Sequence, residues 1–169
     1  MSRQKQLDFN APAGDLRIAA NDDCVSYWQP QPANGFAEVI LSPANVDTVH
    51  RFSMGRQLLP PGGRVRPHAH DTAEEVLYVL SGSGSAEIEG KTYRMNPGTT
   101  LYLGHKRAHT FHNDGDTDLQ WVWFFMPGGL ETFFAAIGPE RRPGEPTPAP
   151  FPRPADIAAI EANSVIAVR

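Results

Sequence analysis

Three histidines and a glutamate stand at spacings that suit one metal ion. His68 and His70 are two residues apart, directly after the turn-forming run 60–63 (Pro-Pro-Gly-Gly). On a strand, both imidazoles would point to the same face, whereas on a helix they would diverge by about 200°. Glu75 follows after enough residues to reverse the chain, and His109 lies on a later predicted strand. The set predicts a mononuclear metal site.

Glu75 has a competitor in its neighbour Glu74. We expect Glu75 to be the ligand because it shares strand parity with Leu77 and Val79, whereas Glu74 falls in the turn. Three imidazoles and one carboxylate suit a divalent transition metal, which we expect to be Fe, Mn, Ni, Zn or Cu. Glu75 is also the residue that we expect to transfer a proton in catalysis.

The elements that must position these residues are short strands separated by turns. Apolar segments at Val25–Trp28, Phe36–Leu41 and Val46–Met54 precede the site. Seven further segments have strand length, and they are Arg64–His70, Glu75–Leu80, Gly84–Glu89, Lys91–Met95, Thr99–Leu103, Ala108–Asn113 and Leu119–Met126. Because no helical pattern separates them, they predict an all-β sandwich or barrel.

The character of the chain changes after residue 127. Leu130–Ile137 has a helical apolar face, which we expect to pack on the barrel. Six prolines between residues 143 and 154 predict an extended strap. We also expect a short helix at Asp156–Ala162 and a terminal strand at Val165–Val168. The predicted organisation is a lead-in (1–23), a barrel (24–127) and a C-terminal extension (128–169).

Two segments resemble the paired motifs of the cupin superfamily. Residues 62–82 match the first motif through Gly62, His68, His70, Glu75 and Gly82. Residues 98–113 resemble the second motif through Gly98, His109 and Asn113, although Gly104 replaces its proline and Lys106 its glycine. The resemblance covers about residues 55–127. It implies a jelly-roll β-barrel with extra N-terminal strands, metal ligation by the three histidines and Glu75, and a homodimer.

Four further residues are candidates to bind a substrate. Arg66 shares parity with His68 and would hold a carboxylate, phenolate or enolate if it points into the barrel, or is solvated if the strand end is exposed. Trp123 lies on one face of an aromatic strand, and either face of that strand can line the cavity. Phe111 shares a face with His109, and Tyr102 is a candidate hydrogen-bonding residue near the metal, or an ordinary outward tyrosine.

Composition narrows the function classes. The chain has 169 residues, a net charge of −4, one cysteine and no basic cluster, so we expect no nucleic-acid partner and no structural disulfide. No apolar run indicates a membrane span or secretory signal, and we expect a cytoplasmic protein that binds a small molecule. The complete set of three histidines and one glutamate beside an aromatic strand leads us to expect a mononuclear-metal dioxygenase that acts on a small phenolic or enolisable substrate. The alternatives are a non-redox cyclase, isomerase or decarboxylase, and a non-catalytic binding protein.

Overall fold

Strands dominate the protein, as its sequence predicts. A computed structural model describes residues 11–20 and 23–167, which form eleven strands and two short helices. The strands are β1 (Val25–Trp28), β2 (Phe36–Leu41), β3 (Ser53–Leu59), β4 (Arg64–His68), β5 (Glu74–Ser81), β6 (Gly84–Ile88), β7 (Lys91–Met95), β8 (Thr100–Leu103), β9 (His109–His112), β10 (Leu119–Met126) and β11 (Glu140–Arg141). The helices are α1 (Leu130–Ile137) and α2 (Ile157–Ala162).

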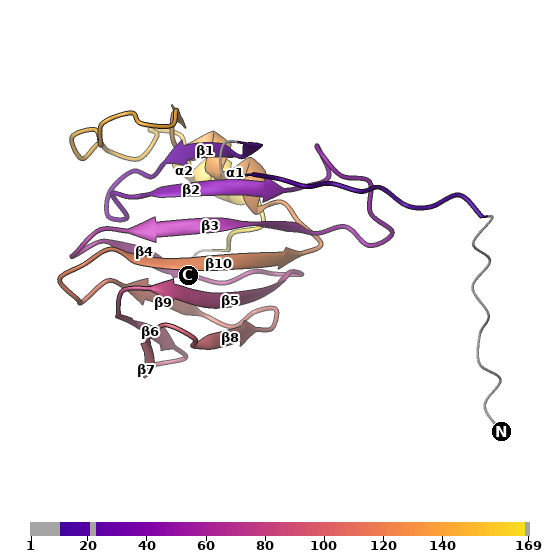
Figure 1. Ribbon diagram of the computed structural model, residues 1–169. Helices are drawn as coiled ribbons and strands as arrows, with labels where there is room; N and C mark the ends of the chain where they lie inside the picture. Colours follow the sequence, from indigo (N-terminus) through magenta and orange to yellow (C-terminus); the bar gives the residue numbers. More distant parts are fainter. Residues whose placement is uncertain (1–10, 21–22, 168–169) are drawn as a thin grey trace, which may run out of the picture.

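Two antiparallel sheets enclose the core, and Figure 1 shows the smaller sheet behind the larger one. The larger sheet has the order β11-β1-β2-β3-β10-β5-β8, and the smaller has the order β4-β9-β6-β7. Buried side chains from both sheets, among them Leu77, Trp121, Met95 and Phe111, meet in one cluster. This is the expected jelly roll, and β1 and β2 are the expected extra strands, which lengthen the larger sheet.

The alternation along β10 shows why these residues form a strand. Trp121, Trp123 and Phe125 are fully buried, whereas Val122 and Phe124 between them are half-buried on the outer face. β10 pairs with both β3 and β5, so it is an interior strand of the larger sheet, next to the strand that carries Glu75. Burying three large aromatic side chains on one face stabilises both pairings.

Two sequence predictions fail at strand ends. The segment predicted at Val46–Met54 becomes a strand only from Ser53, because the Asn45 side chain bonds to the main chain of Ser42 and Ile40 and forms a turn instead. The predicted terminal strand at 165–168 is a single bridge between Ala167 and Ala69, and Val168 lies outside the described residues. β11 was not predicted, and it pairs with β1 at the sheet edge.

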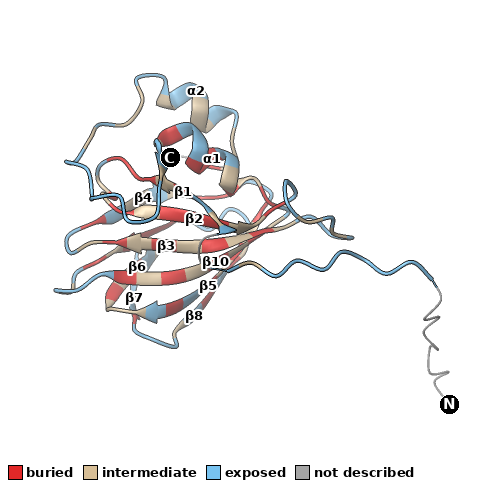
Figure 2. Ribbon diagram, turned by 45° about the horizontal axis from the view of Figure 1, so that its top comes forward, coloured by how far each residue is buried: buried red, intermediate tan, exposed pale blue. Residues whose placement is uncertain are grey.

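The C-terminal helices gather at one end of the barrel, as Figure 2 shows. The predicted apolar face of α1 is confirmed, since Leu130, Phe133, Phe134 and Ile137 are all buried. Phe134 packs against Trp123 of β10 with ring centroids 5.7 Å apart. The extension is therefore part of the hydrophobic core. Neither helix in the described residues has the length or the apolar character that crossing a membrane requires.

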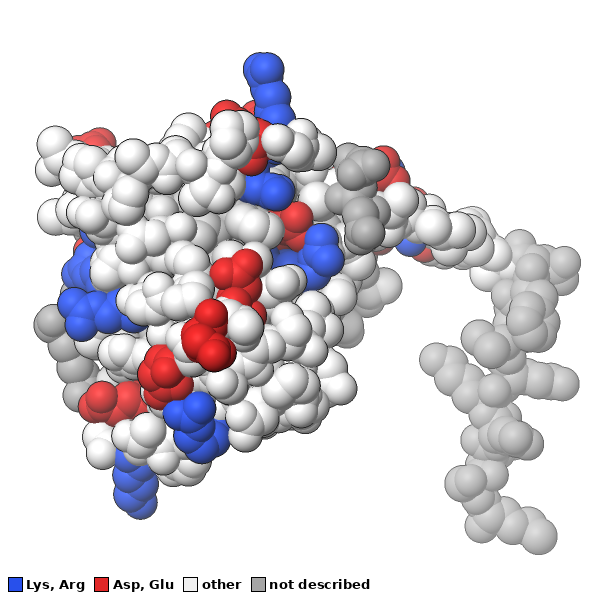
Figure 3. All heavy atoms as spheres, turned by 60° about the vertical axis from the view of Figure 1, so that its left-hand side comes forward, with Lys and Arg blue, Asp and Glu red and all other residues white. Residues whose placement is uncertain are grey.

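Charges of both signs are interspersed on the surface. On the face in Figure 3, Asp and Glu side chains lie beside Lys and Arg side chains, and no continuous basic surface appears there. An exposed ion pair joins Arg94 to Asp114, whose Nη1 and Oδ2 atoms are 2.9 Å apart.

The packing at Gly55 gives a test of the fold. Gly55 of β3 is paired with Trp123, and a Cβ atom there would lie 2.5 Å from the Trp123 indole and would overlap the Glu38 carbonyl. We expect Gly55→Ala to lower the free energy of unfolding by about 3 kcal/mol. Denaturant titration measures this, with Gly104→Ala as control because its nearest neighbour is 3.8 Å away. Equal free energies of unfolding for Gly55→Ala and Gly104→Ala would show that β3 shifts to accommodate the added methyl group.

Candidate metal centre

The three predicted histidines converge on one point. His68 ends β4, His109 begins β9, and the two are register partners, while His70 follows β4 after one residue. One ring nitrogen from each histidine lies within 4.8 Å of the other two. His70 and His109 are buried and His68 is half-buried. The predicted triad is confirmed as a group placed to bind a metal.

Main-chain bonds hold β4 beside β9 and so set this geometry. The Gly62 N–H donates to the Asn113 carbonyl at 3.0 Å, and the Asn113 N–H donates to the Gly63 carbonyl at 2.9 Å. Gly62 has a φ of 77°, a left-handed conformation that favours glycine. These motif residues therefore fix the turn that aligns His68 with His109.

Each imidazole has one nitrogen bonded to a backbone carbonyl. Nδ1 of His68 lies 2.8 Å from the Arg66 oxygen, and Nδ1 of His109 lies 2.8 Å from the Arg107 oxygen. Nδ1 of His70 lies 3.0 Å from the Val165 oxygen. A carbonyl can only accept, so Nδ1 carries the hydrogen in all three rings. The Nε2 lone pairs are thereby left for a metal, as second-shell partners arrange in known sites.

Glu75 brings a carboxylate to the same point. Its Oε2 lies 3.5 Å from Nε2 of His70 and 3.5 Å from Nε2 of His109. Among the described residues, none of these three buried atoms has a hydrogen-bond partner. Buried polar atoms without partners are costly, and lone pairs facing a carboxylate repel it. A divalent cation would satisfy all of them, so the residues present fit the expected metal, with Glu75 as the predicted fourth ligand.

The electrostatics of the metal-free site favour the ligand forms of two residues. Burial, with repulsion from His109 and His70, lowers the pKa of His68 to about 3. Burial alone would raise the pKa of Glu75, but hydrogen bonds from Nε2–H groups of His109 and His70, and the positive charge of these rings when they are protonated, lower it to about 2. His68 is therefore neutral and Glu75 ionised at neutral pH, which are the forms that bind metals.

The low pKa of His68 makes the metal-free protein sensitive to acid. Because the unfolded chain takes up this proton first, the free energy of unfolding decreases as the pH falls from 6.5 towards about 3. We expect this group to contribute up to about 1.4 kcal/mol per pH unit. Unfolding of the chelated protein at several pH values, beside His68→Gln, measures the difference. If the free energies of unfolding of the two proteins changed equally with pH, the expectation would be contradicted.

The competing carboxylate points elsewhere. Glu74 is the first residue of β5 rather than part of a turn, which corrects the sequence prediction. Its Oε1 accepts a hydrogen bond from the Tyr102 hydroxyl at 2.8 Å on the outside of the sheet. Tyr102 is 63% exposed there and does not line the pocket, because its strand position faces away from the core. Leu77 and Val79 are buried with Glu75, as strand parity predicts.

A pocket of about 670 Å³, including space open to solvent, leads to His68 and Glu75. Of the predicted substrate residues, Arg66 and Phe111 line it. Trp123 does not, because it lies in the core against Gly55 and Phe134. The pocket is also lined by residues that the sequence analysis did not single out for the site, namely Gln29–Ala33, Gln57, Leu130, Phe133, Phe134, Ile137, Arg153, Glu161 and Ile166. The helical pattern of 130–137 was the only signal for any of them.

Comparison with known proteins supports the motif assignment. Residues 55–125 match the sequence profile of the cupin domain family. This segment is a cupin domain. Polyketide synthase CurC of Streptomyces cyaneus is 29% identical over 93 residues, or 55% of this chain and 60% of CurC. An oxalate-binding protein of Thermotoga maritima is 33% identical over 67 residues, or 40% of this chain and 55% of that protein.

The cupin fold also appears among solved structures. Polyketide cyclase RemF from Streptomyces resistomycificus superimposes with a TM-score of 0.57 and 19% identity, covering 66% of this chain and 79% of RemF. This likeness shows a shared fold. The chain spans 60% of the length of CurC and 55% of the length of the oxalate-binding protein. The pocket residues after position 125 lie outside the segment that matches the cupin domain family.

The loop before His109 has a left-handed residue at the position where the cupin motif has a glycine. Lys106, which replaces the motif's glycine, has a φ of 64°. This left-handed conformation is uncommon for a residue with a side chain. The Lys106 N–H donates to the His70 carbonyl at 2.7 Å. The loop is thus tied to one of the ligands despite the substitution.

Proposed function

We propose that this protein is a metal-dependent enzyme that acts on an enolisable carbonyl compound by non-redox chemistry, as a cyclase or isomerase does. The observation that carries the proposal is the set of unpartnered Nε2 and carboxylate atoms next to a pocket with an apolar wall. A divalent metal held by His68, His70, His109 and Glu75 would supply Lewis-acid polarisation of a substrate carbonyl.

The protein's own residues would supply the proton transfer and the environment. The Glu75 carboxylate faces the pocket and is ionised, so it would accept the proton from the carbon next to the substrate carbonyl. The apolar side chains of α1 and Phe111 line the same pocket and would exclude water from the substrate. Similarity to a polyketide synthase protein supports this class, since polyketides are rich in enolisable carbonyls.

The dioxygenase expected from the sequence stays the second candidate. Its support is the donor set itself, because three imidazoles and a carboxylate also suit redox-active iron, manganese, nickel and copper. Both candidates begin with deprotonation of the substrate, at carbon for a ketone or β-diketone and at the hydroxyl group for a flavonol. They differ in whether oxygen is consumed afterwards.

One experiment separates the candidates. Metal content is determined on freshly purified protein, and the loaded protein is incubated with phenylacetone in deuterated buffer without oxygen. We expect deuterium exchange at the carbon next to the carbonyl, lost after chelation and in Glu75→Gln. Oxygen uptake with β-diketones or flavonols would instead favour the dioxygenase. Bound metal with neither exchange nor oxygen uptake would contradict both and indicate a binding protein.

A further inference from the structure

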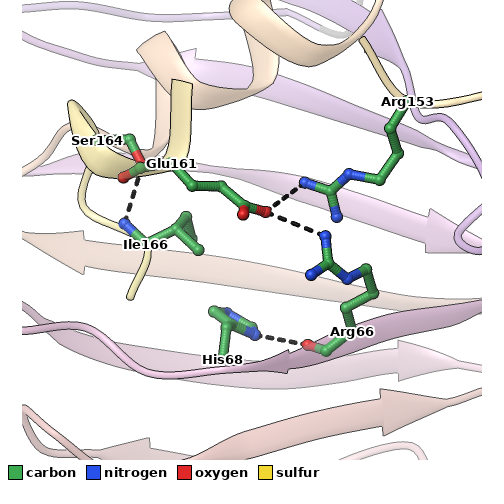
Figure 4. Close-up of polar contacts among 6 residues, drawn as sticks. All are labelled: Arg66, His68, Arg153, Glu161, Ser164 and Ile166. Atoms are coloured by element: carbon green, nitrogen blue, oxygen red, sulfur yellow. Dashed lines mark hydrogen bonds and ion pairs between the residues drawn. The ribbon is translucent and has the colours of Figure 1, made fainter. Parts of the chain in front are cut away.

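Two arginines share one glutamate in the wall of the pocket. Arg66 comes from β4, Arg153 from the proline-rich strap and Glu161 from α2, and Figure 4 shows both guanidinium groups directed at the same carboxylate. Glu161 Oε1 lies 3.1 Å from Arg66 Nη1 and 2.6 Å from Arg153 Nη2. From the sequence, Arg66 is a candidate to bind an anionic group of the substrate. The structure adds an internal partner and a second arginine.

This cluster belongs to the same pocket as the metal ligands. Arg66, Arg153 and Glu161 line the pocket together with His68 and Glu75. The Arg66 carbonyl also accepts the hydrogen bond from His68 Nδ1 at 2.8 Å, so the cluster begins two residues from a ligand. The two arginines and the ligands His68 and Glu75 therefore face one cavity.

The pocket holds an excess of positive charge. Its lining contains three arginines, at positions 64, 66 and 153, but only two carboxylates, of Glu75 and Glu161. A divalent metal on Glu75 would increase this excess further. Guanidinium groups that are partly removed from water need anions nearby, and one shared carboxylate neutralises only half of the pair. The charge balance favours a ligand that brings its own negative charge.

The arginines also have unused hydrogen-bond donors. Both ion pairs use a single oxygen, Oε1 of Glu161, whereas a guanidinium carries five N–H groups and commonly binds a carboxylate through two of them. The Nε atom of Arg153 is buried and has no hydrogen-bond partner among the described residues. Spare donors on a cationic, half-buried pair form a site for an oxyanion.

We propose that Arg66 and Arg153 form an anion subsite that binds a carboxylate of the substrate beside Glu161. The inference rests on the proposed function for the rest of the substrate, whose carbonyl group would face the metal ligands. The substrate class is then a keto acid, with or without an aryl substituent. Glu161 competes with that carboxylate for the same donors, and it sets the affinity of the subsite.

The probes for the test are benzoate and its neutral analogue benzamide. Each is titrated calorimetrically into the full chain, both metal-loaded and chelated. We expect benzoate to bind in both forms and benzamide to bind at least about tenfold more weakly. Arg66→Gln and Arg153→Gln should each weaken benzoate about tenfold, with Arg66→Lys losing less. Glu161→Gln should tighten benzoate, because it removes the competing carboxylate.

The controls make the result decisive. Arg94→Gln removes an exposed arginine that pairs with Asp114 outside the pocket, and it should leave benzoate binding unchanged. Tighter binding by Glu161→Gln cannot result from misfolding, so this variant tests the subsite even if the arginine variants are unstable. The subsite would be overturned if Arg66→Gln, Arg153→Gln and Glu161→Gln all left the affinity for benzoate unchanged. It would also be overturned if benzoate bound only to the metal-loaded protein.

The benzoate titration and the deuterium-exchange experiment can succeed or fail separately. Deuterium exchange of phenylacetone uses a neutral ketone and needs no carboxylate, so it can succeed where benzoate binding fails. Conversely, benzoate binding to the arginines in a protein that holds no metal would support the subsite and contradict the enzyme assignment.

Discussion

Replacing His109 by alanine is expected to abolish metal binding. The imidazole is fully buried, its Nε2 lies 3.5 Å from Glu75 Oε2, and its Nδ1 is fixed by the Arg107 carbonyl. Without it, two histidines and one carboxylate remain, and bound metal per chain should fall from about one to below about 0.1. Because a bound metal stabilises the folded state by mass action, Tm in excess metal should drop by about 10 °C.

The measurement combines elemental analysis with thermal unfolding. His105→Ala is the matched control, since His105 is exposed in the loop just before His109 and should keep its metal. Removing a buried side chain also costs packing energy, so both variants are compared with the original protein in chelator, where the metal contributes nothing. Stoichiometric metal in His109→Ala would overturn the assignment of the site.

The pair His68 and His70 was predictable because its information is local. His68 and His70 share a face through strand periodicity alone, and the glycine turn before them marks where the strand begins. The choice between Glu74 and Glu75 likewise follows from parity, since one residue along a strand exchanges the inner face for the outer one. The two carboxylates accordingly lie on opposite sides of β5, one beside the histidines and one beside Tyr102.

The pocket wall was less predictable because it depends on tertiary contacts. Arg153 stands in a proline-rich stretch and Glu161 on a six-residue helix without a buried residue, so neither has a pattern that indicates a site. Their meeting with Arg66 requires the strap to cross the end of the barrel. Trp123 shows the same limit, because alternation left open which face of its strand lines the cavity, and Phe134 of α1 packs against the face that carries Trp123.

The last element of the site comes from the end of the described chain. The Val165 carbonyl accepts the hydrogen bond from His70 Nδ1 at 3.0 Å, and Ala167 pairs with Ala69 through two main-chain bonds of 2.8 Å. Ile166 between them lines the pocket. A residue far from both motifs thus fixes the orientation of a motif ligand, and the extension completes the second shell of the cupin domain.

Ending the chain after Asn163 is therefore expected to weaken metal binding while α2 and the pairing of Arg66 with Glu161 are kept. We expect the Kd for metal to rise by at least about tenfold, because His70 loses the acceptor that fixes its tautomer and its ring orientation. Competition with a chromophoric chelator measures this Kd.

A chain ending after Ala167 retains both contacts and is the control. Stability in chelator reports any loss of packing separately, since the bridge to Ala69 is lost as well. Equal metal affinities in the two truncated chains would mean that His70 holds its orientation without Val165, and that the metal centre is complete within the barrel.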